Sequence, residues 1–209
     1  MKHERRFIPG PAGRLQAILR PGGERRPAVV LCHPHPLYGG TMRNRVVYWM
    51  ARTFEELGCT VLRFNFRGVE ESEGEWDGGV GECDDAAAVC DWLAGRMPGS
   101  PLWMGGFSFG CYAGLRAAAG DGRVVRLFAV APPVHHFDFG FMADNGKPLV
   151  VIQGDADEIV PAEAVARWAA EVPNARLHRI AGAGHFFPDH LPELQRLLRG
   201  AAAHDGSGA

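Results

Sequence analysis

The sequence contains neither a long apolar run nor an excess of charge of one sign. No stretch of its 209 residues approaches the roughly 18 consecutive apolar residues that a membrane-spanning helix requires. The chain has 22 basic and 24 acidic residues, so its formal net charge is only −2. Proteins that bind nucleic acid or an anionic membrane usually carry a concentrated basic patch. We therefore expect neither nucleic acid nor a membrane as a partner.

Motifs for metals and nucleotides are also missing. The His33-Pro34-His35 segment has no third ligand at a metal-binding spacing, and no His-Glu-x-x-His pattern occurs. The glycines of residues 105–110 lack the spacing of a dinucleotide-binding loop, and Lys147 lacks the upstream glycine loop of a nucleoside-triphosphate site. We expect no metal and no cofactor.

The cysteines do not form a disulfide pattern. The chain has five, an odd number, and none belongs to a Cys-x-x-Cys pair. Since Cys32, Cys59 and Cys90 lie among apolar residues, reduced thiols are expected. No apolar stretch of signal-peptide length follows the basic residues at the amino terminus. Together these features predict a cytoplasmic protein.

Size and composition predict one globular domain. The chain is 46% hydrophobic and 22% charged, which is typical of a soluble fold. A chain of this mass buries roughly 70% of its surface on folding, so its core needs no disulfide or metal. We expect a single domain over residues 1–203 and a disordered tail over residues 204–209.

Short apolar runs alternate with helical patterns along the chain. Strands separated by helices of about 10 to 15 residues form a parallel sheet that is covered on both faces. Residues 5–8 and 14–20 are too close together for a crossover and predict an antiparallel hairpin at the sheet edge. The predicted fold class is therefore α/β, with a mostly parallel, twisted sheet of about eight strands. The other expected strands are residues 27–32, 59–66, 101–107, 124–130, 149–153 and 175–180, and the expected helices are residues 46–57, 83–92, 109–119, 162–171 and 191–203.

The sharpest local signal is Gly106-Phe107-Ser108-Phe109-Gly110, a G-x-S-x-G pattern between an expected strand and an expected helix. Such a turn exposes the central serine above the carboxyl edge of the sheet, and its glycines permit close approach of neighbouring chains. The first N–H groups and the positive end of the helix face the same place, which suits an oxyanion. The plainer interpretation is a glycine-rich turn with a serine N-cap. We interpret Ser108 as a candidate nucleophile.

A serine hydroxyl needs a base within hydrogen-bond reach and a third group that orients the base. Asp155 and Asp157 form an acidic turn after the strand expected at residues 149–153, so both should lie at the same sheet edge as Ser108. Each aspartate is also compatible with a loop residue or a helix cap; we select Asp157. His185 follows the final expected strand on a glycine-containing loop and is the candidate base.

The chain resembles the α/β-hydrolase superfamily, and within it a small bacterial branch without a lid. The order serine, acid, histidine is that of this superfamily. The resemblance implies that Ser108 is the nucleophile, Asp157 the acid and His185 the base. One departure is that Glu70 and Glu71 stand where the family usually has a glycine before the serine. The motifs that carry the resemblance are HPHPLYGGTMRN at residues 33–44, RFNFRGV at 63–69, SEG at 72–74, GFSFG at 106–110, GDAD at 154–157 and GH at 184–185.

The expected oxyanion hole uses two backbone N–H groups. One belongs to Phe109, directly after the candidate nucleophile. The other should come from the loop after residues 27–32, where Pro34 and Pro36 have no N–H. Among residues 34–36 only His35 can therefore donate, and residues 38–40 are the alternative.

The expected site is open to solvent. Residues 131–147 are too few for a cap domain between the two strands that they join. A shallow acyl pocket is predicted, with Leu37, Tyr38, Pro133 and Phe137 as substrate-binding residues; packing of loops over the sheet edge explains these side chains equally well. Such a pocket favours short acyl groups.

These features predict hydrolysis of a small carboxylic ester or thioester through an acyl-enzyme. The expected partner is a small-molecule acyl substrate, and the sequence leaves the oligomeric state open. An acyltransferase, or an amidase or peptidase with the same three side chains, is the alternative enzyme. A binding protein that keeps the fold without turnover is the alternative from another class.

Overall fold

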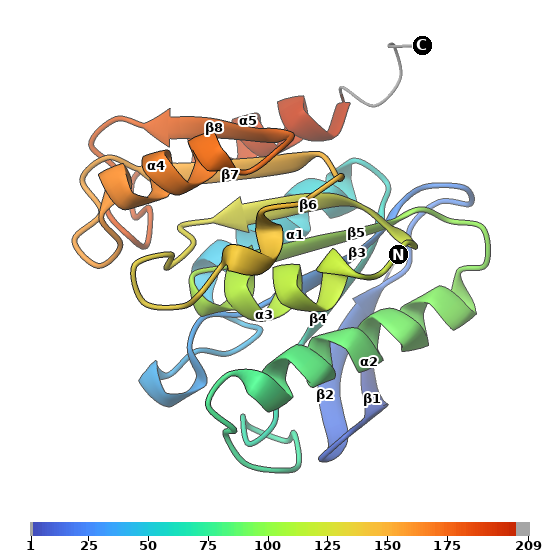
Figure 1. Ribbon diagram of the computed structural model, residues 1–209. Helices are drawn as coiled ribbons and strands as arrows, with labels where there is room; N and C mark the ends of the chain where they lie inside the picture. The colour runs from blue at the N-terminus through green and yellow to red at the C-terminus, as the bar shows by residue number, and fades with distance from the viewer. Residues whose placement is uncertain (1, 204–209) are drawn as a thin grey trace.

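The protein is described here by a computed structural model that covers residues 2–203 and is built around one sheet of eight strands (Figure 1). The strand order is β1-β2-β4-β3-β5-β6-β7-β8. The pairs β1–β2 and β2–β4 are antiparallel, and the other neighbours are parallel. This confirms the predicted α/β class and the edge hairpin. The strands are β1 (Glu4–Gly10), β2 (Gly13–Arg20), β3 (Ala28–Cys32), β4 (Thr60–Phe64), β5 (Leu102–Phe107), β6 (Val124–Val130), β7 (Leu149–Gly154) and β8 (Ala175–Ile180).

Helices cover both faces of the sheet. In Figure 1, α2, α3 and α4 lie in front of the sheet, and α1 and α5 lie behind it. Side chains of β3 alternate between the two layers, since Val29 and Leu31 pack on the α1 and α5 side while Val30 and Cys32 pack on the other. The helices are α1 (Arg45–Glu56), α2 (Val80–Arg96), α3 (Phe109–Ala119), α4 (Ala162–Glu171) and α5 (Leu191–Ala203).

Several element bounds differ by one or two residues from the sequence-based expectation, and two differences involve polar contacts of named side chains. The strand expected at residues 59–66 is assigned only as far as Phe64. After it, the Asn65 N–H still donates to the Gln16 carbonyl of β2 at 2.8 Å, while the Asn65 side chain accepts the Met42 N–H from the loop after β3. Helix α2 begins at Val80, three residues early. Its start is stabilised by Glu82, whose carboxylate accepts the N–H groups of Gly79 at 2.8 Å and Asp77 at 3.0 Å.

No cap domain separates β6 from β7. Residues 131–148 contain one short 3₁₀ helix, η2 (Gly140–Met142), as the chain length led us to expect. All five cysteines are buried free thiols. No helix within residues 2–203 is both long enough and apolar enough to cross a membrane. The tail expected at residues 204–209 lies outside the described residues.

Candidate active site

Ser108 occupies the tight turn between β5 and α3. Its backbone has φ 52° and ψ −124°, a left-handed conformation that residues with side chains rarely adopt. The turn is held by the Ser108 N–H, which donates to the Val130 carbonyl at 2.9 Å. Although Ser108 precedes α3, its side chain makes no capping hydrogen bond, so the N-cap interpretation is wrong. The hydroxyl instead faces His185.

The glycines on either side of this turn are required by close approach of the backbone. A Cβ added at Gly106 would lie 2.3 Å from the Gly110 carbonyl group, and a Cβ at Gly110 would lie 2.3 Å from the Cys32 carbonyl oxygen. Neither glycine has a positive φ. Any side chain at Gly110 would therefore push α3 away from the end of β3 and the loop that follows it.

The structure brings Ser108, His185 and Asp157 into one hydrogen-bonded line. Ser108 Oγ lies 3.1 Å from His185 Nε2, and His185 Nδ1 lies 2.9 Å from Asp157 Oδ2. The three residues follow β5, β8 and β7, whose carboxyl ends meet at one edge of the sheet. The imidazole is only 3% exposed and the Asp157 carboxylate is fully buried. A proton can therefore pass between hydroxyl and imidazole while the carboxylate fixes the ring.

The Asp157 carboxylate is held in its ionised form. Burial raises its pKa, but hydrogen bonds from His185 and from the N–H groups of Val160 and Ile159 outweigh burial and lower the pKa below its usual value. Gln153 Nε2 donates a further hydrogen bond to Oδ2 at 2.9 Å. A negative charge thus remains beside the imidazole at neutral pH and stabilises its protonated form.

The neighbouring acidic residues have different partners. Asp155 accepts the Gly182 N–H at 2.6 Å, and Glu158 accepts the His185 backbone N–H at 3.1 Å. Of the two aspartates considered from the sequence, Asp157 is the one that contacts the imidazole. The sequence analysis missed Gln153 and Glu158, which hold the acid and the histidine loop; no local motif marks either of them.

The second donor of the oxyanion hole was expected from His35 or from residues 38–40 in the loop after β3. Of these, only the His35 N–H has no acceptor in the described structure. The N–H groups of residues 38–40 all donate to the carbonyl oxygens of His35 and Pro36. Within residues 2–203, the N–H groups of His35 and Phe109 have no hydrogen-bond acceptor. Among the considered donors, these two are therefore available to a ligand.

Aromatic rings surround the start of α3. The His35 ring packs against Trp76 at 4.5 Å, Tyr38 at 4.7 Å and Phe109 at 5.2 Å between centroids. Phe137 contacts Phe109 at 5.4 Å. The sequence analysis did not select Trp76, because it lies in an irregular loop whose path only the tertiary structure defines.

The four predicted substrate-binding residues have different environments. Leu37 is 65% exposed and Tyr38 is 86% exposed, in the 3₁₀ turn η1 (Pro36–Tyr38). Pro133 is buried and Phe137 is half-buried. Tyr38 and Phe137 both contact the His35 ring, at 4.7 and 6.4 Å. The structure thus gathers part of the predicted set around His35, while Leu37 points into solvent.

His33 connects the loop after β3 to the loop after β4. Its ring is completely buried, with Nδ1 2.6 Å from the Pro34 carbonyl oxygen and Nε2 accepting the Phe66 N–H at 3.0 Å. Because Nε2 accepts a hydrogen bond, the ring is neutral. Burial lowers the pKa of His33 from 6.5 to about 4.

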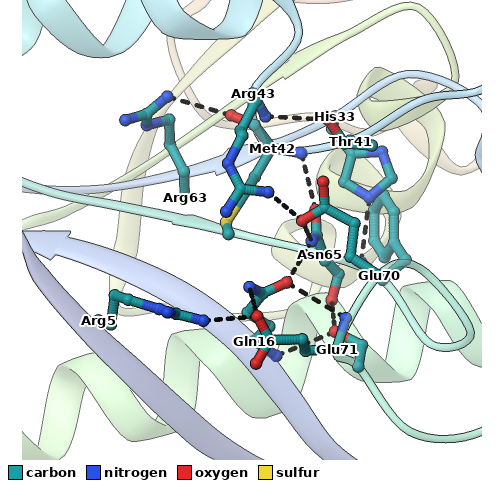
Figure 2. Close-up of polar contacts among 12 residues, drawn as sticks. Arg5, Gln16, His33, Thr41, Met42, Arg43, Arg63, Asn65, Glu70 and Glu71 are labelled. Carbon is teal, nitrogen blue, oxygen red and sulfur yellow. Dashed lines mark hydrogen bonds and ion pairs between the residues drawn. The ribbon is translucent and has the colours of Figure 1, made fainter.

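A buried polar network supports the same loops (Figure 2). Asn65 Oδ1 accepts the Met42 N–H at 2.8 Å, and its Nδ2 donates to Gln16 Oε1 at 2.7 Å and Glu70 Oε2 at 2.8 Å. Gln16 in turn donates to Glu71 at 3.0 Å. The network therefore ties the edge hairpin to the loops after β3 and β4.

Glu70 is one of the two glutamates that stand between Val69 and Ser72, and its φ is 50°. A side chain is strained in this left-handed conformation. The carboxylate compensates by binding Asn65 and pairing with Arg43.

Across residues 2–203, no group of three or more histidine, cysteine, aspartate or glutamate side chains is arranged to hold a metal ion.

The eight-stranded sheet and the serine turn define the class of this protein, an α/β serine hydrolase. Residues 14–151 match the model of the family described as X-Pro dipeptidyl-peptidase (S15 family), and the chain belongs to this family. The predicted resemblance to the α/β-hydrolase superfamily is thus confirmed.

Relatives cover almost the whole chain. An uncharacterized protein of Rickettsia prowazekii is 38% identical over 204 residues, which are 92% of this chain and 85% of that protein. The structure of an α/β serine hydrolase without lid from Xanthomonas campestris is 38% identical with a TM-score of 0.89, over 96% of this chain and 94% of that one. An α/β serine hydrolase homologue from Coxiella burnetii is 40% identical with a TM-score of 0.90, over 95% and 97%.

The close backbone contact at Gly110 leads to a prediction about stability. We expect Gly110→Ala to lower the free energy of unfolding by about 3 kcal/mol, because its Cβ would meet backbone atoms. Gly120→Ala at the other end of α3 is the control, since its Cβ would meet nothing within 4 Å. Urea denaturation measures both; equal stabilities of the two variants would contradict the close-approach argument.

The low pKa of His33 leads to a prediction about how stability depends on pH. Its pKa is about 4 in the folded protein and near 6.5 when unfolded, so only the unfolded chain takes up a proton between these values. Stability is full above pH 6.5 and falls as the pH drops. We expect wild type to lose about 2 kcal/mol more than His33→Gln between pH 7 and pH 5. Urea titrations at each pH measure this; parallel pH curves would show that His33 is not the cause.

Proposed function

We propose that this protein hydrolyses small carboxylic esters or thioesters through an acyl-enzyme formed on Ser108. The observation that carries the proposal is the hydrogen-bonded line from Ser108 Oγ through the His185 imidazole to the Asp157 carboxylate, at 3.1 and 2.9 Å. A serine is activated by a base in this geometry. The partner is then a small-molecule acyl substrate.

In the first half of the reaction, His185 Nε2 takes the hydroxyl proton as Ser108 Oγ attacks the carbonyl carbon. Asp157 keeps the Nδ1–H directed toward itself and stabilises the imidazolium. The N–H groups of Phe109 and His35 hold the oxyanion, each contributing about 10²-fold to 10³-fold in rate. His185 then gives the proton to the leaving alcohol or thiol.

In the second half, water replaces the leaving group. His185 removes a proton from the water as its oxygen attacks the acyl carbonyl, and returns that proton to Ser108 Oγ as the carboxylic acid departs. The ionised state of Asp157 supports both halves, because its lowered pKa keeps the charge opposite the imidazole throughout.

The open surroundings of Ser108 favour short acyl groups. Residues 131–148 provide no cap, and Tyr38 in the loop beside His35 is largely exposed. We propose Leu37, Tyr38, Pro133 and Phe137 as substrate-binding residues. Without a cap, a long acyl chain would have little apolar surface to cover.

A second candidate reaction is cleavage of a peptide or amide. The family match, with its description as an X-Pro dipeptidyl-peptidase, favours it. The same three side chains would act, with the amine as leaving group in place of the alcohol. Comparing kcat/KM for p-nitrophenyl acetate and for an Xaa-Pro p-nitroanilide separates the two reactions.

The cysteine thiols support a cytoplasmic location, which we also propose. Burial raises the pKa of the Cys59 thiol to about 11 and that of Cys90 to about 12. Such thiols stay protonated and unreactive at neutral pH. Buried free thiols are typical of proteins kept in a reducing compartment.

A fluorophosphonate probe tests the nucleophile. We expect wild type to be labelled and Ser108→Ala to remain unlabelled, because the probe reacts with an activated serine hydroxyl. Ser100→Ala is the matched control and should be labelled like wild type. Intact-mass spectrometry measures the adduct. An unlabelled wild type would favour a binding protein on this fold.

Alanine substitution of the two aspartates tests the acid. We expect Asp157→Ala to reduce kcat on p-nitrophenyl acetate by roughly 10³-fold to 10⁴-fold, since the imidazole loses the group that orients it. Asp155→Ala should leave kcat close to wild type, because Asp155 contacts Gly182 and not His185. If Asp155→Ala is the more damaging change, the proposed acid is wrong.

A further inference from the structure

Large apolar side chains are exposed at the edge of the sheet that holds the candidate active site. Leu37 and Tyr38 lie after β3, Ile159 after β7 and Phe186 after β8, and their exposed fractions run from 49% to 86%. The carboxyl ends of these parallel strands meet at this edge. Exposed apolar surface that gathers in one place often marks a binding surface. Phe186 directly follows His185 in the chain, and its ring contacts the imidazole.

Phe186, Phe107 and His185 form a cluster of three rings. The Phe186 centroid lies 5.0 Å from that of the imidazole, with the rings at 87°, and 6.0 Å from that of Phe107. Phe107 also lies 5.0 Å from the imidazole. Edge-to-face contacts at these distances are favourable between aromatic rings. Because Phe107 is fully buried and Phe186 is 50% exposed, Phe186 forms the outer part of the cluster.

The backbone that carries Phe186 is anchored on both sides. The His185 N–H donates to Glu158 Oε2 at 3.1 Å, and the Phe187 N–H donates to the Gly184 carbonyl at 3.1 Å. The Phe187 side chain is completely buried in the layer between the sheet and helices α1 and α5. The exposed part of the Phe186 ring is therefore a preformed apolar surface, and little conformational entropy is lost when a ligand covers it.

The two sides of Ser108 carry different aromatic groups. Phe107 and Phe109, which precede and follow it, pack on opposite faces of the sheet. The His35 ring packs on Phe109, at 5.2 Å between centroids, whereas Phe186 packs on Phe107. Phe186 is thus available to the half of a substrate that does not lie beside His35.

The chemistry of the proposed reaction identifies that half. The leaving alcohol takes its proton from His185 Nε2, so its oxygen must come within about 3 Å of this nitrogen. Carbon atoms bonded to that oxygen are then within reach of a ring whose centroid is 5.0 Å from the imidazole. Phe186 therefore lies beside the alcohol half of the ester, while the acyl half stays bonded to Ser108.

We propose that Phe186 is a specificity-determining residue for the alcohol half of the ester, and that this half is bulky and apolar, such as an arylmethyl group. The proposal rests on the acyl-enzyme reaction proposed above. As the bond between the acyl carbon and the alcohol oxygen breaks, its electron pair stays on the oxygen, which takes the proton from His185 Nε2. The apolar part of the alcohol covers Phe186, and this contact removes apolar surface of both groups from water.

Benzyl acetate and methyl acetate are the probes, because they share an acyl group and their alcohols are of nearly equal acidity. We expect the wild-type kcat/KM to be roughly tenfold higher for benzyl acetate. Phe186→Ala should bring this ratio close to one, and Phe186→Leu, which keeps an apolar side chain, should give an intermediate ratio. Phe7→Ala is the matched control, since Phe7 is 41% exposed on β1 at the sheet edge, and it should keep the wild-type ratio. Titration of the released acetic acid at constant pH measures both reactions.

The ratio of the two kcat/KM values separates specificity from a purely structural role. If Phe186 only supports the imidazole, Phe186→Ala will slow both esters by the same factor and leave the ratio unchanged, which would overturn the proposal. A wild type that hydrolyses both esters with equal kcat/KM would overturn it too, without affecting the proposed function. Hydrolysis of neither ester, together with no fluorophosphonate label on wild type, would overturn the proposed function and this proposal with it.

Discussion

The backbone contact between the start of α3 and the end of β3 controls the geometry of the site. At Gly110 the two backbones are so close that a Cβ would lie 2.3 Å from the Cys32 carbonyl oxygen. This approach fixes the turn at Ser108, with its φ of 52°. It also brings the N-terminus of α3 against the loop that carries His35. The Ser108 side chain, the N-terminus of α3 and the loop N–H groups are positioned by one packing constraint.

Buried polar groups then hold the loops that this contact leaves irregular. His33 accepts the Phe66 N–H, and Asn65 accepts the Met42 N–H. Irregular backbone near a core needs such partners, since an unpaired buried N–H is costly. Asn65 also binds Gln16 of β2. The antiparallel hairpin at the sheet edge therefore contributes to the position of the loop beside Ser108.

The parallel sheet brings different residues to its two edges. The carboxyl ends of β5, β7 and β8 lead to Ser108, Asp157 and His185, while the amino ends of β7 and β8 lie at a cavity with Arg176 and His178. Every parallel strand contributes to both edges, because its direction is fixed by the crossover helices. The same strands thus bring Ser108, Asp157 and His185 together at one edge of the sheet and line that cavity at the other.

The sequence by itself determined the parallel sheet, the boundaries of α3, α4 and α5, and the serine turn, because hydrophobic periodicity and turn glycines are local signals. It also indicated Asp157 and His185, since each follows a strand whose carboxyl end is predictable. Only the tertiary structure decided the partners of Asn65 and Glu158, and the contact of Phe186 with Phe107. These contacts join residues far apart in the chain, where no periodic pattern specifies distance.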